Sequence, residues 1–171
     1  MPKYMITIKE KSYSVEDIMR PAIFTSSTAT LEETLQKMIT ERRNSLTVLA
    51  EDGTLMGMVN AIDIIKAVLP NYMEESNLAA RFSNIELLKE DAERVKDTPV
   101  ADFMETEVPT IKVDGNVIEA AAIAAHTGRG RIAVVNTDNK PVGILTRTEL
   151  KQVIGATLGM CGDCFTDSDD K

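Results

Sequence analysis

Two copies of one sequence pattern run through this chain of 171 residues. The segment VEDIM at 15–19 aligns with VADFM at 100–104, an offset of 85 residues. After one inserted residue the offset becomes 86, and LTVLAEDGTLMGMV at 46–59 aligns without a gap with IAVVNTDNKPVGIL at 132–145. Similarity at a fixed spacing indicates one supersecondary unit that occurs twice. The chain is therefore predicted to be a tandem repeat, which limits its fold more than any single motif does.

The first copy predicts elements in the order helix, strand, helix, strand, strand, helix. Ser14 is expected to cap the opening helix, and residues 23–25 form a short extended segment. Thr30 and Glu33 have the spacing of a capping box that begins an amphipathic helix. The apolar stripe predicted for that helix comprises Leu31, Leu35, Met38 and Ile39. A hairpin with an Asp-Gly turn follows, and the last helix, AIDIIKAVL, ends before Pro70.

The second copy predicts the same order with different capping residues. Pro99, after Thr98, is expected to occupy the first helical position of the opening helix, because its fixed φ suits that place. Residues 108–112 form the extended segment. The long helix is predicted to begin after Asn116 and to end at Gly128. The hairpin IAVVN to VGIL and the helix RTELKQVIGATL complete the copy.

The predicted fold class is α/β, or α+β, with two repeats related by a pseudo-two-fold axis. The middle strands are rich in β-branched residues and are expected to be buried on both faces. A three-stranded sheet covered by its own two helices leaves one face open, so neither copy is expected to be stable alone. The predicted segments are an N-terminal segment 1–13, repeat 1 at 14–69, a connecting segment 70–97, repeat 2 at 98–158 and a flexible acidic tail 159–171.

The connecting segment is too long for a bare loop and is predicted to contain a helix. Ser83 and Glu86 resemble a capping box, which would begin this helix. Helical spacing is kept by Ile85, Leu88, Ala92 and Val95.

Charge and composition argue against several classes of function. The net charge of -8 argues against binding to nucleic acid or to an anionic membrane, because both need basic residues. The sequence shows neither a long apolar run nor an N-terminal leader, so we expect a cytoplasmic protein. His126 is the only histidine, and Cys161 and Cys164 form a single CxxC that cannot complete a four-ligand zinc site. No nucleophile and base set is visible, so we expect no enzyme.

The repeated pattern, V-x-D-h-M followed by a hairpin and G-h-h-(T/S)-x-x-(D/N), resembles the tandem pair of cystathionine-β-synthase (CBS) domains, or Bateman module. The resemblance covers about 14–69 and 98–158, most of the chain, so it indicates a stand-alone pair. It implies a regulatory module that binds adenosine-containing ligands such as AMP, ADP, ATP or S-adenosylmethionine in clefts between the repeats. It also implies a homodimer, and no required cofactor.

The two helix starts that follow the hairpins are the strongest candidate sites. Asn60 and Thr146 stand where a strand becomes a helix, and the unpaired N–H groups of a helix start favour a phosphate. Asp63 and Glu149 lie three residues further on, where a carboxylate could accept from both hydroxyls of a ribose. The alternative is that these pairs only cap their helices: T-x-x-E is a capping box, and for Glu149 we favour the cap, whereas for Asp63 we favour the ligand.

Other candidate ligand residues follow from the resemblance and from the needs of adenine. A basic residue just before the middle strand often touches phosphate in family members, and Arg131 holds that position, with Arg129 nearby. Thr146, Thr148 and Arg131 together form a set that suits an anion. Adenine needs an apolar slot with backbone amides, which strand edges supply. The candidates for this slot are Ile23, Thr25, Met58, Thr110 and Ile132.

The copies differ, so we expect at most one tightly bound nucleotide per chain. The first copy has Asp63 but Asn60 in place of a hydroxyl, whereas the second has Thr146 but the longer Glu149. The leading hypothesis is a nucleotide sensor that signals to a protein partner. The alternatives are a structural dimerisation module with degenerate ligand sites, or a thiol- or metal-linked regulator acting through Cys161 and Cys164.

Overall fold

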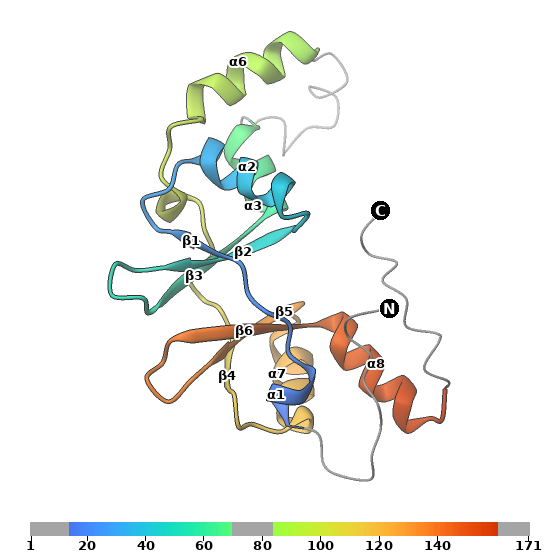
Figure 1. Ribbon diagram of the computed structural model, residues 1–171. Helices are drawn as coiled ribbons and strands as arrows, with labels where there is room; N and C mark the ends of the chain where they lie inside the picture. Colours follow the sequence, from blue (N-terminus) through green and yellow to red (C-terminus); the bar gives the residue numbers. More distant parts are fainter. Residues whose placement is uncertain (1–13, 70–83, 161–171) are drawn as a thin grey trace. The chain divides into compact units, whose positions relative to one another are not determined.

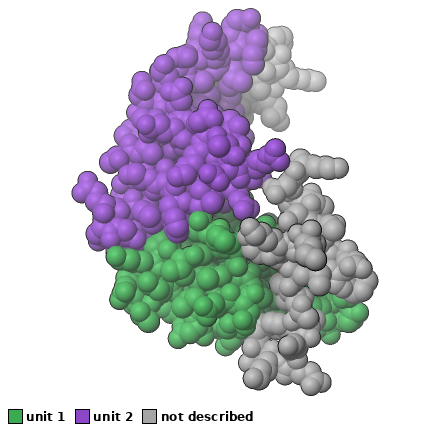
Figure 2. Space-filling model, viewed as in Figure 1, with its two compact units in different colours: residues 1–22, 108–171 green, residues 23–107 purple. Residues whose placement is uncertain are grey.

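A computed structural model describes residues 14–69 and 84–160, and the chain divides into two compact units. Unit 1 takes the chain up to Ala22 and from Val108 onward, whereas unit 2 takes Ile23–Glu107 (Figure 2). The CxxC at 161–164 lies outside the described residues. Within the described residues, no helix is both long enough and apolar enough to span a bilayer.

Unit 2 is built on a three-stranded sheet in the order β1-β2-β3 (Figure 1). Strand β1 (Phe24–Ser26) pairs parallel with β2 (Ser45–Leu49), and β2 pairs antiparallel with β3 (Leu55–Asn60). The parallel pair needs a crossover, which α2 (Leu31–Thr40) supplies, whereas the antiparallel pair needs only a tight turn. Gly53 in that turn has φ 80, a left-handed conformation that glycine adopts without strain.

Helix α2 and helix α3 (Ala61–Val68) cover the same side of this sheet (Figure 1). The core between them and the sheet contains Leu31, Met38, Leu46, Val48, Val59, Ile64 and Val100. The Thr30 and Glu33 capping box is confirmed, because each side chain accepts from the other residue's N–H. The predicted apolar stripe is wrong in part: Leu35 and Ile39 are 38% and 63% exposed, and Thr34 is buried instead.

Unit 1 repeats this arrangement with the order β4-β5-β6. Its strands are β4 (Thr110–Lys112), β5 (Arg131–Val135) and β6 (Pro141–Thr146), and its helices include α7 (Val117–Thr127) and α8 (Arg147–Thr157). The predicted caps of α7 are confirmed: Asn116 accepts from the Glu119 N–H, and Gly128 ends the helix in the left-handed conformation. The core includes Ile111, Val117, Ile132, Val134, Leu145 and Val153.

The opening segment of each repeat belongs to the unit that contains the other repeat's strands. Helix α1 (Val15–Ile18) lies in unit 1, where the Val15 N–H donates to the Gly115 carbonyl at 2.8 Å. The 3-10 helix η1 (Val100–Asp102) lies in unit 2, where the Val100 N–H donates to the Ala29 carbonyl at 2.8 Å. A repeat in the sequence and a compact unit in space are therefore different divisions of this chain.

The two opening helices differ because their caps differ. Ser14 and Asp17 form a capping box, and α1 is an α-helix. The prediction that Pro99 occupies the first helical position is wrong: its ψ of 143 is extended, and it precedes a single 3-10 turn. The backbone on both sides of Pro99 bonds to the segment 29–31, through the Thr98 carbonyl and the Val100 N–H, and this pairing requires an extended residue between them.

The connecting helix is α6 (Ile85–Val95), and it packs on α3. Its N-cap is Asn84, whose side chain accepts from the Leu87 N–H, so the prediction of a start at Ser83 is wrong by one residue. Ser83 itself lies outside the described residues. Asn is as effective an N-cap as Ser, which explains why the sequence pattern did not separate them.

Candidate functional sites at two helix starts

Each unit has one candidate site, at the point where the last strand of the hairpin becomes a helix. In unit 2, Asn60 ends β3 opposite Ser45 at the start of β2. In unit 1, Thr146 ends β6 opposite Arg131 at the start of β5. The register therefore places the first residue of each middle strand beside the residue that caps each final helix. Only unit 1 carries a cation at this place.

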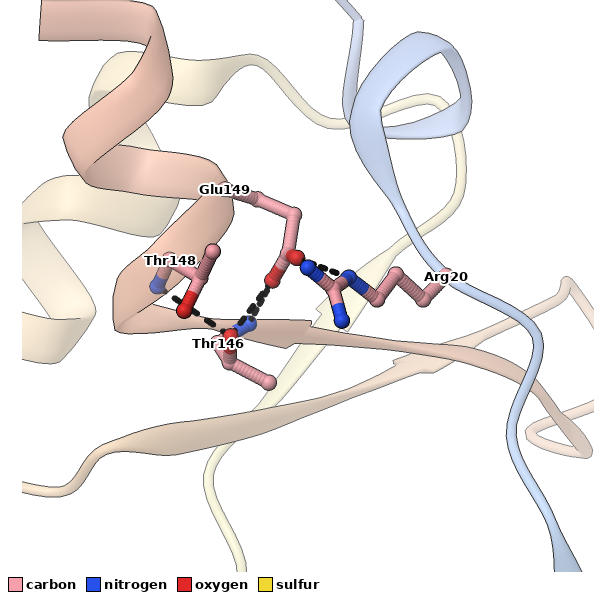
Figure 3. A network of polar contacts seen from close by, with 4 residues as sticks. All are labelled: Arg20, Thr146, Thr148 and Glu149. Atoms are coloured by element: carbon pink, nitrogen blue, oxygen red, sulfur yellow. Dashed lines mark hydrogen bonds and ion pairs between the residues drawn. The ribbon is translucent and has the colours of Figure 1, made fainter. Parts of the chain in front are cut away.

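At the start of α8, the carboxylate of Glu149 is buried, with hydrogen bonds at Oε2 and an ion pair at Oε1. Its Oε2 atom accepts from the Thr146 N–H at 2.7 Å and from the Thr146 hydroxyl at 2.6 Å (Figure 3). That hydroxyl in turn accepts from the Thr148 N–H at 3.1 Å. Glu149 is only 2% exposed, so water does not compete for these hydrogen bonds. This arrangement is a capping box extended by one hydroxyl.

Arg20 completes the network at the start of α8. It lies just after α1, and its guanidinium Nε atom forms an ion pair with Oε1 of Glu149 (Figure 3). The backbone of Arg20 is fixed as well, because it exchanges two hydrogen bonds of 2.9 Å with Ile144 of β6. A buried carboxylate is stable as an anion only when it is paired and hydrogen-bonded, and Arg20 supplies the pairing charge.

At the start of α3, the corresponding acid is less engaged. Oδ2 of Asp63 accepts from the Asn60 N–H at 2.7 Å, and within the described residues this is its only hydrogen bond. Asp63 is half-buried. The side chain of Asn60 makes no capping bond, and its Oδ1 atom is buried with no hydrogen-bond partner in the described part of the chain. The α3 start thus combines an accessible carboxylate with an unsatisfied amide oxygen.

Two basic residues lie near the start of α8, one at the start of β5 and one at the start of α8 itself. Arg131 is half-buried at the first position of β5. The loop before β5 is held by Arg147, whose guanidinium donates to the Gly128 carbonyl at 3.1 Å. A Cβ atom on Gly130 would lie 3.1 Å from that guanidinium, so the arginine lies directly on the glycine. Arg147 is therefore a support of the loop.

The predicted adenine-contacting residues divide between the units. Ile23, Thr25 and Met58 lie in unit 2, and Thr110 and Ile132 lie in unit 1. Thr25, Met58 and Ile132 are buried, with Ile132 in the core of unit 1. Ile23 is partly buried against the core of unit 2, and Thr110 is exposed at the start of β4. The sequence-predicted residues therefore divide into two sets, one in each unit.

Sequence reasoning missed Arg20. The residue follows the VEDIM motif by one position, and its partner Glu149 is far away in the sequence, so no local spacing connects them. A signal was nevertheless present. At the aligned position of the second copy the chain has Glu105, a residue of opposite charge, and a charge reversal between repeats marks a position where the two copies have different neighbours.

The two sequence repeats match a known family model. Residues 15–70 and 100–156 match the model of the CBS domain. The chain belongs to the CBS domain family. Because the two matches cover most of the chain, the tandem arrangement and the mixed α/β fold predicted from the sequence are confirmed. CBS-pair proteins are generally regulatory modules.

Two relatives match most of this chain. An uncharacterized protein of Methanocaldococcus jannaschii, MJ1426, is 25% identical over 82% of this chain and 90% of its own length. The chloroplastic CBS domain-containing protein CBSX2 of Arabidopsis thaliana is 24% identical over 83% of this chain and 63% of its own length.

Solved CBS pairs have the same fold and bind adenosine compounds. CBSX2 in complex with AMP matches 85% of this chain and 98% of that chain, with a TM-score of 0.63 and 21% identity. The CBS pair of MJ0100, in complex with 5′-methylthioadenosine and S-adenosyl-L-methionine, matches 86% of this chain and 99% of that chain, with a TM-score of 0.63 and 21% identity. At this identity the comparison establishes the fold, not the ligand.

Proposed function

We propose that this CBS pair is a regulatory module that binds one adenosine-containing ligand, such as AMP, ADP, ATP or S-adenosylmethionine, at the start of α3. Asp63 is the observation that carries the proposal, because its half-buried carboxylate has a single hydrogen bond within the described residues. The ligands named for CBSX2 and MJ0100 support the adenosine class.

The chemistry of the α3 start suits a ribose with a phosphate. A carboxylate that accepts from the two ribose hydroxyls makes charge-assisted hydrogen bonds, each worth roughly 1.5–3 kcal/mol. The first N–H groups of α3 and its partial positive charge favour the phosphate. Asn60, beside them, brings an unsatisfied amide oxygen that a ligand N–H or O–H can satisfy.

The proposal assigns this module a signalling role without catalysis. Ligand binding would change the stability or shape of a cytoplasmic homodimer and so alter its contact with a protein partner. No cofactor takes part, and the nucleotide acts only as a regulatory ligand. This portion of the proposal rests on the general role of the family.

The direct test is a calorimetric and thermal-shift panel of AMP, ADP, ATP and S-adenosylmethionine on the full chain. We expect one of them to bind and to raise the melting temperature, since a ligand that binds only the folded state stabilises it. Asp63→Ala should weaken that binding by about tenfold to a hundredfold, as expected for the loss of one or two charge-assisted hydrogen bonds. The matched control is Asp52→Ala, an exposed acid in the β2–β3 turn, which should bind normally.

A structural dimerisation module is the second candidate function. The engagement of Glu149 by Arg20 favours it, because a start of α8 occupied by protein groups no longer needs a ligand. Absence of stabilisation by all four compounds at millimolar concentration would reject the sensor and leave this function. A thiol- or metal-linked role for Cys161 and Cys164 is a third proposal, tested by zinc content and by the sensitivity of the oligomer to reductant.

A further inference from the structure

The two candidate sites have the same backbone hydrogen bonds between an opening segment and the strand before the helix, but they carry opposite charges at one position of that segment. In unit 1, Arg20 exchanges two hydrogen bonds with Ile144, two residues before the cap Thr146. In unit 2, Glu105 exchanges two hydrogen bonds of 2.8 and 2.9 Å with Met58, two residues before the cap Asn60. Arg20 and Glu105 are also aligned in the repeat, at an offset of 85. Each residue therefore takes the same backbone position relative to the helix start of its unit.

From this backbone position, the side chain of Arg20 contacts Glu149 in the first turn of α8. Its guanidinium pairs with Glu149 Oε1, and the other oxygen, Oε2, is taken by Thr146 (Figure 3). A diol must donate to carboxylate oxygens that have room for it. Oε2 already accepts two hydrogen bonds and Oε1 is buried against Arg20, so the Glu149 carboxylate cannot serve a ribose while Arg20 is in place. At the equivalent position Glu105 carries a negative charge, which cannot neutralise Asp63.

We propose that Arg20 and Glu105 are the specificity-determining residues of the two sites. Arg20 closes the α8 start to ribose by occupying Glu149, and Glu105 leaves Asp63 open at the α3 start. The adenine nucleotide then binds once per chain, in unit 2. This inference rests on the proposed function for the ligand class, but it concerns which residue selects the site.

The decisive experiment asks whether removal of Arg20 opens the second site. AMP, ADP and ATP are titrated by calorimetry into the wild-type chain, Asp63→Ala, and the double variant Arg20→Ala with Asp63→Ala. The wild-type chain should bind one nucleotide per chain, Asp63→Ala should bind about tenfold or more weakly, and the double variant should regain binding through Glu149. Because Glu is one methylene longer than Asp, Glu149→Asp added to the double variant should strengthen the regained site.

The matched control removes a cation of unit 1 that does not touch Glu149. Lys112, whose ammonium donates to the Asn136 carbonyl, serves this purpose, and Lys112→Ala with Asp63→Ala should not regain binding. Circular dichroism and thermal unfolding establish that each variant is folded. If Arg20→Ala does not fold, Arg20→Gln keeps most of the side-chain length and removes the charge.

The reciprocal variant tests the same inference at the open site. Glu105→Arg should close Asp63 and weaken nucleotide binding about tenfold or more, whereas the same charge change two residues away, Glu107→Arg, should not. If wild-type binds but neither Arg20→Ala with Asp63→Ala regains binding nor Glu105→Arg loses it, this inference is overturned and the proposed function stands. Two equal sites in the wild-type chain would overturn it too. No binding by any chain would overturn both.

Discussion

The start of α8 and the start of α3 show how one duplicated frame acquires two different sites. Both have a strand that runs into a helix, an acid at the third helical position, and an opening segment that pairs with the preceding strand. At the start of α8, Glu149 is buried and paired with Arg20. At the start of α3, Asp63 is half-buried and its carboxylate accepts one hydrogen bond, from a backbone N–H. Glu149 is therefore part of the structure at the α8 start, whereas Asp63 at the α3 start is available to the ligand proposed above.

Substitution of Glu149 and Asp63 by alanine should have the most different effects on stability. Glu149→Ala leaves Arg20 and the Thr146 hydroxyl without their buried partner, so it should lower the free energy of unfolding by about 3 kcal/mol. Asp63→Ala removes one cap hydrogen bond at a half-buried position and should cost about 1 kcal/mol. Urea unfolding of both variants measures the difference. Equal losses of unfolding free energy in the two variants would contradict the difference between the two helix starts.

Substitution of Gly57 in β3 and Gly143 in β6 by alanine should show that both units need close contact between this strand and the opening segment. A Cβ on Gly57 would lie 2.6 Å from the Glu105 carbonyl oxygen, and a Cβ on Gly143 would lie 2.9 Å from the Arg20 carbonyl oxygen. Each substitution forces the opening segment away from its strand, and each should cost about 2 kcal/mol in urea unfolding. The exposed neighbours provide the controls: Met56→Ala and Val142→Ala should stay within about 0.5 kcal/mol of wild type.

The smallest expected difference in stability lies between the opening helices α1 and η1. The contribution of the α1 cap depends on pH. The N–H and hydroxyl of Ser14 donate to Asp17 and hold the pKa of that carboxyl below its ordinary value of 3.8. A lowered pKa means that the stabilisation is present above the ordinary value and is lost as pH falls through the lower, folded-state value. Because Asp17 is exposed, Asp17→Asn should cost only about 0.5 kcal/mol near neutral pH.

Urea midpoints of wild type and Asp17→Asn should therefore converge as the pH is lowered below 3.8. The equivalent variant in unit 2, Asp102→Asn, should cost less stability near neutral pH than Asp17→Asn, because Pro99 has no N–H and no hydroxyl to donate to Asp102. An equal loss of stability in the two variants near neutral pH would show that the two openings do not differ in the way described.

Local patterns predicted the parts of the fold that depend on neighbours in sequence. The caps at Thr30, Asn116 and Gly128 were predictable because each is made within one turn of its helix. The repeat predicted the hairpins and the family. Asn60 lies opposite Ser45 and Thr146 lies opposite Arg131, because the strand register is fixed by the hairpin turn.

Contacts made by the exchanged opening segments could not be predicted in this way. The position of Pro99 is set by its pairing with the segment 29–31, and the partner of Glu149 is a residue of the other repeat. Both depend on which unit each opening segment joins, and alignment of the copies carries no information on that choice. The sequence therefore predicted the acids at the two helix starts but not which of them was already paired.

The exchange of opening segments also has a consequence for dissection of the chain. A protease cut, or a designed truncation, in the connection after α3 would separate the two repeats but would not release two intact modules. The first fragment would lack η1 and Glu105, and the second would lack α1 and Arg20. Ile23–Glu107 is the continuous stretch that contains a whole unit, so boundaries drawn there, rather than at the repeat, are the ones suited to a fragment that folds.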